Sequence, residues 1–115
     1  MKVFCIMENP SLRQVVQRAI GQTHTTAFHN NPVRAMEIMK TSEPDIILFN
    51  FEDFPRHWES IYVFSKYILN KCKFILLFGR SFLINDSSKA NFLDVQTLPW
   101  HTDAKRFMQE LKDKI

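Results

Sequence analysis

The sequence predicts an α/β fold in which five parallel strands alternate with five helices. Short apolar runs alternate with segments in which apolar residues recur every three or four positions, as in a helix with one buried face. Ile46 to Asn50 and Lys73 to Phe78 are almost continuously apolar, which indicates strands that are buried on both faces. Because parallel neighbours need crossover connections, and helices supply them, the pattern indicates a doubly wound parallel sheet.

The first half of the chain contains two strand-helix units before the buried strand at Ile46. Val3 to Met7 is an apolar strand, and from Leu12 to Ile20 the apolar residues share one face of a helix. Residues 24 to 29 are β-prone and follow a turn-like stretch. Asn31-Pro32 then provides a helix N-cap with proline at the first helical position, so we expect the second helix to begin there.

The second half contains three expected helices and the last strand. Pro55 is expected to open the third helix, in which one face is formed by Trp58, Ile61, Tyr62, Ser65, Ile68 and Leu69. Arg80 to Asn91 is polar and only weakly periodic, which predicts a weak or shortened fourth helix. Phe92 to Leu98 is expected to be the fifth strand, and Ala104 to Ile115 repeats apolar residues at helical spacing.

Length and composition limit the classes of protein. With 115 residues, 45% of them hydrophobic, the chain is expected to form one domain over residues 1–115. No apolar run approaches the roughly 18 residues of a membrane span, and no cleavable signal is visible, so we expect a cytoplasmic protein without membrane contact. The net charge is only +3, with lysines and arginines scattered among acids, so direct nucleic-acid contact is not expected. Cys5 and Cys72 match no metal spacing.

The residues that could carry chemistry are those at the carboxyl ends of the strands, where doubly wound sheets bind their ligands. These are Met7 to Asn9, Asn50 to Asp53, Phe78-Gly79 and Leu98-Pro99. A dinucleotide site is disfavoured, because the turn after the first strand has no glycine.

Four segments in fixed order resemble one known family. They are Glu8 to Arg13, Pro32 to Lys40, Pro44 to Asn50, and Leu98 to Trp100. In order and spacing they are similar to the receiver domain of two-component response regulators, the flavodoxin-like CheY family, over nearly the whole chain. The resemblance implies a sheet in which the strands are ordered 2-1-3-4-5.

The resemblance also implies a phosphoryl-transfer pocket that has lost its working groups. The family uses two acids, an acceptor aspartate, a hydroxyl residue and a lysine, with Mg²⁺ between the acids and the phosphoryl group. The matching positions here are Met7, Glu8, Asn50, Phe78 and Leu98, so only Glu8 keeps a suitable charge. We therefore expect an atypical pseudo-receiver that lacks the phospho-acceptor aspartate, binds no metal or cofactor and is not an enzyme.

The expected function is regulation through protein contacts, independent of phosphorylation. Two alternatives stay open: phosphorylation at a displaced acid, Glu52 or Asp53, or at a modified Asn50, and small-ligand sensing in the altered pocket. Because the last helix should end near Ile115, we also expect the chain to be the N-terminal part of a longer regulator, for instance of transcription.

The resemblance places the partner or homodimer contact on the fourth helix, fifth strand and fifth helix. The candidate contact residues there are Val95, Trp100, Lys105 and Arg106. Trp100 is the expected aromatic anchor, because large aromatics carry much of the binding energy in many interfaces. The alternative is that Trp100 caps the core and that the charged residues of the last helix form an ordinary solvated face.

Overall fold

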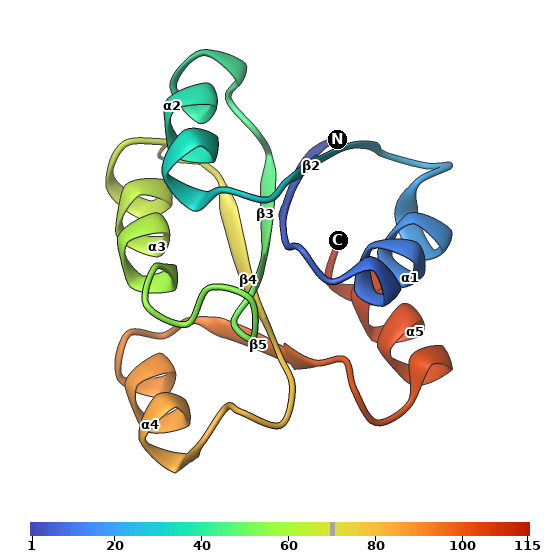
Figure 1. The fold of residues 1–115 in the computed structure, drawn as a ribbon. Coiled ribbons are helices and arrows are strands. Elements are labelled where there is room, and N and C mark those ends of the chain that lie inside the picture. The colour runs from blue at the N-terminus through green and yellow to red at the C-terminus, as the bar shows by residue number, and fades with distance from the viewer. Residues whose placement is uncertain (70) are drawn as a thin grey trace.

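Five parallel strands form a single sheet in the computed structural model, which describes residues 1–69 and 71–115. The strand order is β2-β1-β3-β4-β5, which confirms the predicted doubly wound fold (Figure 1). The strands are β1 (Lys2–Ile6), β2 (Thr25–His29), β3 (Ile46–Asn50), β4 (Lys73–Phe78) and β5 (Gln96–Pro99). In the register, Asn50 at the end of β3 lies opposite Leu77, and Phe78 at the end of β4 lies opposite Pro99.

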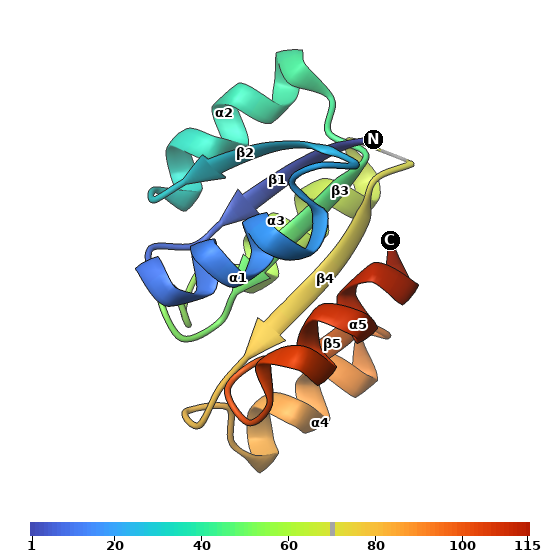
Figure 2. The same cartoon turned by 90° about the vertical axis from the view of Figure 1, so that its right-hand side faces the viewer.

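Helices cover both faces of this sheet. They are α1 (Pro10–Ile20), α2 (Pro32–Ser42), α3 (Trp58–Tyr67), α4 (Ile84–Phe92) and α5 (Ala104–Lys114). α1 and α5 lie side by side on one face, and α2, α3 and α4 lie on the other (Figures 1 and 2). Asn9, Asn31 and Asp103 cap α1, α2 and α5 by accepting a backbone N–H with their side chains. Within the described residues, no helix has the length and apolar character that crossing a bilayer requires.

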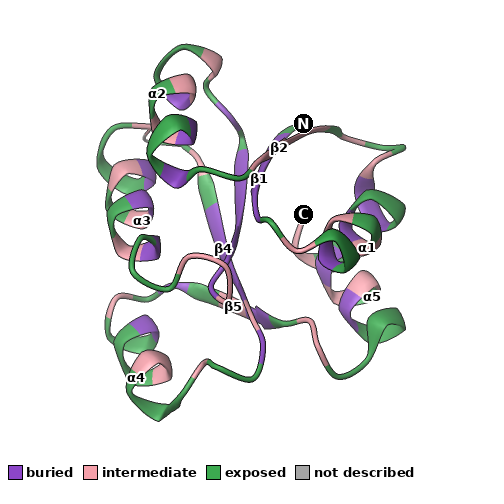
Figure 3. Ribbon diagram, in the orientation of Figure 1, coloured by how far each residue is buried: buried purple, intermediate pink, exposed green. Residues whose placement is uncertain are grey.

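Two cores flank the sheet because successive strand residues point to opposite faces. Val3, Cys5 and Met7 of the first segment join the core beneath α1 and α5. Phe4 and Ile6 join the core beneath α2, α3 and α4. All five residues of β3 are buried, as predicted for a central strand (Figure 3).

Three predicted boundaries are wrong: both ends of α3 and the start of β5. α3 begins at Trp58, since Pro55 lies in a turn, and Ile68 follows the helix and is exposed instead of sharing its buried face. Phe92, expected to start the last strand, is the final residue of α4. The helix is ended by Asp94, whose φ of 58° is left-handed and turns the chain, so β5 starts only at Gln96. α4 is short, as predicted, with nine residues of which only Ala90 is buried.

Candidate functional site

Asn50 stands at the centre of the carboxyl edge of the sheet. It is the last residue of β3 and has no exposed surface. Its side-chain Nδ2 donates to Oδ2 of Asp53 at 2.7 Å, and its Oδ1 accepts a hydrogen bond from Nε1 of Trp100 at 3.2 Å. Since a buried polar group needs partners, this pairing on both sides stabilises the amide in place. A carboxylate at this position could accept from Trp100 but could not donate to Asp53.

Asp53 ties the loop after β3 to the turn after β1. The oxygen that accepts from Asn50 also accepts the backbone N–H groups of Glu8, at 2.6 Å, and Asn9, at 3.0 Å. Glu8 itself is exposed and contributes its backbone N–H to this network. The same turn is held by Arg13, whose Nε and Nη2 both donate to the carbonyl of Met7, at 2.9 and 2.7 Å.

Glu52 ties the same β3-α3 loop to the loop after β4. Its Oε1 accepts the backbone N–H of Gly79 at 2.7 Å, and its Oε2 accepts the backbone N–H of Ser81 at 3.2 Å and also the Ser81 hydroxyl. A Cβ at position 79 would lie only 3.1 Å from Glu52 side-chain carbons, so glycine allows the carboxylate to approach this closely. Together, these two backbone N–H groups and one hydroxyl form an oxyanion-binding loop that the chain fills with its own carboxylate.

Apolar residues occupy the remaining positions. Met7 and Leu98 are buried in the core beneath α1 and α5. Phe78 is only half-buried: it packs against the edge of the other core, and its ring stacks on Phe82 with ring centroids 4.5 Å apart. Of the three apolar replacements, therefore, two lie in the core and one packs on the β4-α4 loop.

The predicted contact residues divide into two kinds. Val95 is 8% exposed and belongs to the core beneath α2, α3 and α4, so little of its side chain is available to a contact surface. Trp100 is partly buried with its indole on Asn50, which fits the capping alternative better than the exposed anchor. Lys105 and Arg106 are exposed on α5, and Arg106 pairs with Glu110 at 2.9 Å.

Sequence reasoning missed Ser81 and the roles of the two acids. The family pattern places the hydroxyl at position 78, whereas Ser81, three residues later, supplies one to Glu52. The available signal was the pair Glu52-Asp53 directly after the buried strand and the Gly79-to-Ser81 turn after the next, both at the same edge of a parallel sheet.

The remaining groups to consider are metal-binding side chains and the two thiols. Among residues 1–69 and 71–115, no three His, Cys, Asp or Glu side chains are grouped so as to hold a metal ion. Burial raises the pKa of Cys5 to about 12 and that of Cys72 to about 12. Both thiols therefore stay protonated near neutral pH, and a protonated thiol is a poor nucleophile.

A protein-family model described as TP_0454_N, N-terminal domain, matches residues 1–95. The chain belongs to this family. No curated protein matches the sequence.

Solved structures show that this member of the TP_0454_N family has the fold of receiver domains. The phosphorylated cyanobacterial phytochrome response regulator RcpA aligns with a TM-score of 0.81 at 17% identity, covering 98% of this chain and 89% of that one. The signal receiver domain of a DNA-binding response regulator from Colwellia psychrerythraea gives 0.75 at 14% identity, covering 99% and 97%. The Mn²⁺-bound response regulator Rcp1 gives 0.76 at 14% identity, covering 97% and 89%.

Proposed function

We propose that the chain is a pseudo-receiver, a regulatory signalling domain that acts through protein contacts and without aspartyl phosphorylation. The observation that carries this proposal is the Glu52 carboxylate seated on the N–H groups of Gly79 and Ser81 and on the Ser81 hydroxyl. In the family that the chain resembles, a hydroxyl residue after the fourth strand holds phosphoryl oxygens. Here a carboxylate of the chain meets the donors of that loop, so the loop is held without a phosphoryl group.

The chemistry at Asn50 supports the same proposal. An amide is a poor nucleophile, and both ends of this one are hydrogen-bonded. Mg²⁺ prefers carboxylate and other oxygen ligands, whereas Met7 is a buried thioether and Leu98 is a buried aliphatic residue where the family has its lysine. Phosphoryl transfer would therefore lack its nucleophile, its metal support and its cation.

The two alternative functions receive less support. Phosphorylation of Glu52 would displace donors, because both of its carboxylate oxygens already accept hydrogen bonds. Asp53 accepts its three hydrogen bonds through Oδ2, and a phosphoryl group on Oδ1 would neutralise the carboxylate charge that strengthens them. Sensing of a small ligand in the altered pocket would require access to Met7 and Asn50, which have no exposed surface.

Incubation with acetyl phosphate and Mg²⁺, followed by intact-mass spectrometry, tests the proposal. We expect no phosphoryl adduct on the natural chain, and none on Asn50→Asp, because Met7 and Leu98 remain in that variant. An adduct that maps to Asn50, Glu52 or Asp53 contradicts the proposal. Glu52→Gln and Asp53→Asn serve as matched variants, since an adduct on either acid must disappear from one of them and persist in the other.

A further inference from the structure

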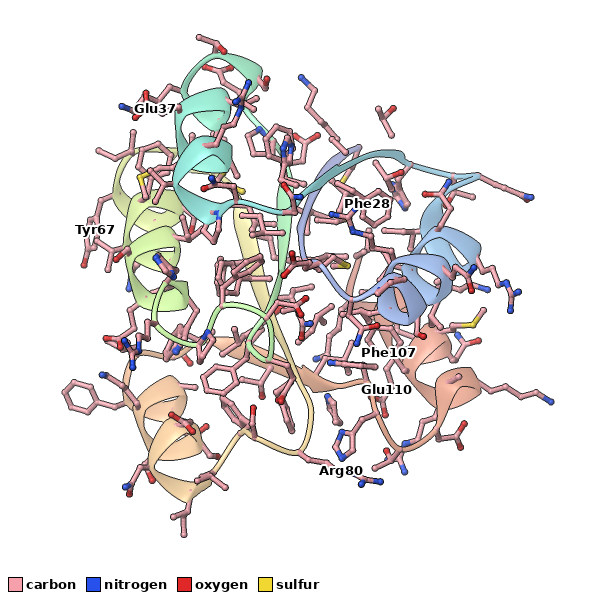
Figure 4. The ribbon with its side chains drawn as sticks, viewed as in Figure 1. Phe28, Glu37, Tyr67, Arg80, Phe107 and Glu110 are labelled. Atoms are coloured by element: carbon pink, nitrogen blue, oxygen red, sulfur yellow. The ribbon has the colours of Figure 1, made fainter. Side chains whose placement is uncertain are left out.

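An apolar groove lies on the outer side of α2 and α3. It has a volume of about 570 Å³ and is lined mainly by Met36, Ser60, Val63, Phe64, Tyr67 and Ile68. Tyr67 is 71% exposed and Ile68 is 64% exposed, so the wall of the groove is open to solvent. Figure 4 shows Tyr67 pointing from α3 away from the sheet. Contiguous exposed apolar surface of this kind marks contact sites on soluble proteins.

An apolar ridge lies on α4, on the same side of the molecule. Ile84 is 81% exposed and Phe92 is 88% exposed. They are eight residues apart, a little over two helical turns, so both side chains lie on the outward half of the helix while Ala90 packs inward. Figure 1 places α2, α3 and α4 in one layer on the same face of the sheet, and the exposed residues of the groove and of this α4 ridge belong to that layer.

A charge pair separates the two features. Nζ of Lys89 on α4 lies 2.7 Å from Oε1 of Glu59 on α3, and Glu59 also lines the groove. One face thus presents a groove, then a pair of opposite charges, then a ridge. When a two-fold rotation places a second copy against this face, the ridge of each copy lies opposite the groove of the other. In that arrangement Glu59 of each copy faces Lys89 of the other.

We propose that a second copy of this chain covers this face, with the α4 ridge of each copy seated in the α2-α3 groove of the other. A two-fold interface requires one self-complementary patch, and this face carries a groove, a ridge and a pair of opposite charges from which such a patch could be built. The groove is large enough for the side chain of Phe92. Area supports it too, since a fully buried aromatic removes roughly 150–250 Å² from solvent. With 71% of Tyr67 and 88% of Phe92 still exposed, the two side chains then supply about a third to a half of the roughly 800 Å² per partner that a standard interface buries.

This dimer rests on the proposed function only in that both assign the domain to protein contacts. It moves the contact away from α5, where the described apolar side chains face the core and charged residues face solvent, and onto α2, α3 and α4. The acetyl phosphate result and the association state are read separately. A chain that acquires a phosphoryl group yet dimerises through Phe92 would overturn the proposed function and support the dimer. A chain that acquires no phosphoryl group and stays monomeric would support the proposed function and overturn the dimer.

Analytical ultracentrifugation across a concentration series tests the dimer. We expect a monomer-dimer equilibrium in the natural chain and no larger species. Phe92→Asp and Val63→Asp should each raise the dimer dissociation constant about 100-fold or more, because every dimer loses two apolar anchors. Val33→Asp is the matched control, since Val33 is an exposed apolar residue of α2 outside the groove lining, and it should leave the constant within about twofold. Circular dichroism checks that each variant is folded.

Cross-linking then tests the pairing of ridge with groove. In a Cys72→Ser background, chains carrying Phe92→Cys are mixed with chains carrying Val63→Cys and treated with a short bismaleimide. We expect the mixed pair to cross-link at least several-fold faster than either chain with itself. A natural chain that stays monomeric at every concentration overturns the proposal. So does a dimer that survives Phe92→Asp and Val63→Asp unchanged, or open-ended oligomers in place of a dimer.

Discussion

The carboxyl edge of the sheet and the outer face of α3 and α4 differ in how their side chains are satisfied. At the edge, the side chains of Asn50, Glu52 and Asp53 are hydrogen-bonded to other groups of the chain. On the outer face, Tyr67 and Phe92 project into solvent without packing against either core. The carboxyl edge, where the resemblance predicts phosphoryl chemistry, is thus closed by hydrogen bonds within the chain. The outer face of α3 and α4 is open, in that it exposes apolar side chains to solvent. The apolar side chains that a partner could contact are therefore those exposed on the helices.

Asn50→Asp is the variant that we expect to disturb the closed carboxyl edge most. The new carboxylate would face Asp53 where an N–H now donates at 2.7 Å, so two like charges would meet inside the edge. We expect a loss of roughly 3–5 kcal/mol in the free energy of unfolding, measured by urea denaturation, as for an uncompensated buried charge. Asn30→Asp, at an exposed position, is the matched control and should be nearly neutral. An unchanged midpoint for Asn50→Asp would mean that the edge is open after all.

Glu52→Gln tests the tether between the two loops. The variant keeps the shape of the side chain but weakens its hydrogen bonds to Gly79 and Ser81, because an amide oxygen is a poorer acceptor than a carboxylate. We expect a loss of roughly 1–2 kcal/mol in unfolding free energy, together with faster amide exchange at Gly79 and Ser81. Glu37→Gln removes an exposed pair with Lys40 and should cost at most about 0.5 kcal/mol. Equal effects of the two variants would argue against the tether.

Trp100→Phe measures the link between Asn50 and the β5-α5 connection. The ring is kept while its N–H is lost, so we expect a cost of about 1 kcal/mol in unfolding free energy. A double-mutant cycle with Asn50→Ala should give a coupling of similar size. Absence of coupling would mean that Trp100 contacts solvent instead of the amide, and the exposed anchor would then regain support.

His29 gives a smaller, pH-dependent effect at the rim of the same edge. Burial, and secondarily the nearby charge of Arg13, lowers the pKa of His29 below its usual 6.5. The unfolded chain therefore takes up a proton first as the pH falls, so stability is full above about pH 6.5 and declines below it. We expect a shallow fall in the denaturation midpoint between pH 7.5 and 5.5 that His29→Gln reduces. An identical pH profile for that variant would exclude His29 as the cause.

Phe92→Ala should have the smallest effect on the fold. In dilute protein, where any dimer is dissociated, we expect a change within about 0.5 kcal/mol, because the side chain is exposed. The matched variant is Phe107→Ala, which removes a buried ring on the core side of α5 and should lower the free energy of unfolding by roughly 3–5 kcal/mol. Comparable losses in the two variants would show that the α4 ridge is part of the core, and the contrast between closed edge and open face would disappear.

The sheet and most helix starts could be predicted because their signals are local. β3 is apolar on both faces, and Asn31-Pro32 both caps α2 and sets its first turn. The boundary between α4 and β5 could not, because Phe92 and Leu93 look like the start of an apolar strand, whereas the left-handed turn at Asp94 decides where the helix ends. Local pattern cannot reveal a single residue with positive φ that is not glycine.

The pocket positions could be located from spacing, but their contacts could not. Glu52 reaches Gly79 and Ser81 across 27 and 29 residues, and Trp100 reaches Asn50 across 50. Those contacts depend on the paths of three loops, which a pattern of apolar residues does not determine. The sequence therefore predicted which residues stand at the family's pocket positions but did not reveal the hydrogen bonds that Glu52 and Trp100 make there.

The Glu52 tether differs from a phosphoryl group in how long it lasts. An acyl phosphate is hydrolysed, so a domain governed by one returns to its resting state after a characteristic lifetime. The carboxylate that occupies the β4-α4 loop here is part of the polypeptide and lasts as long as the chain does. Under the proposed function, a signal carried by this domain would therefore have no lifetime set by phosphoryl hydrolysis. Its strength would instead follow the rates at which the protein is made and degraded.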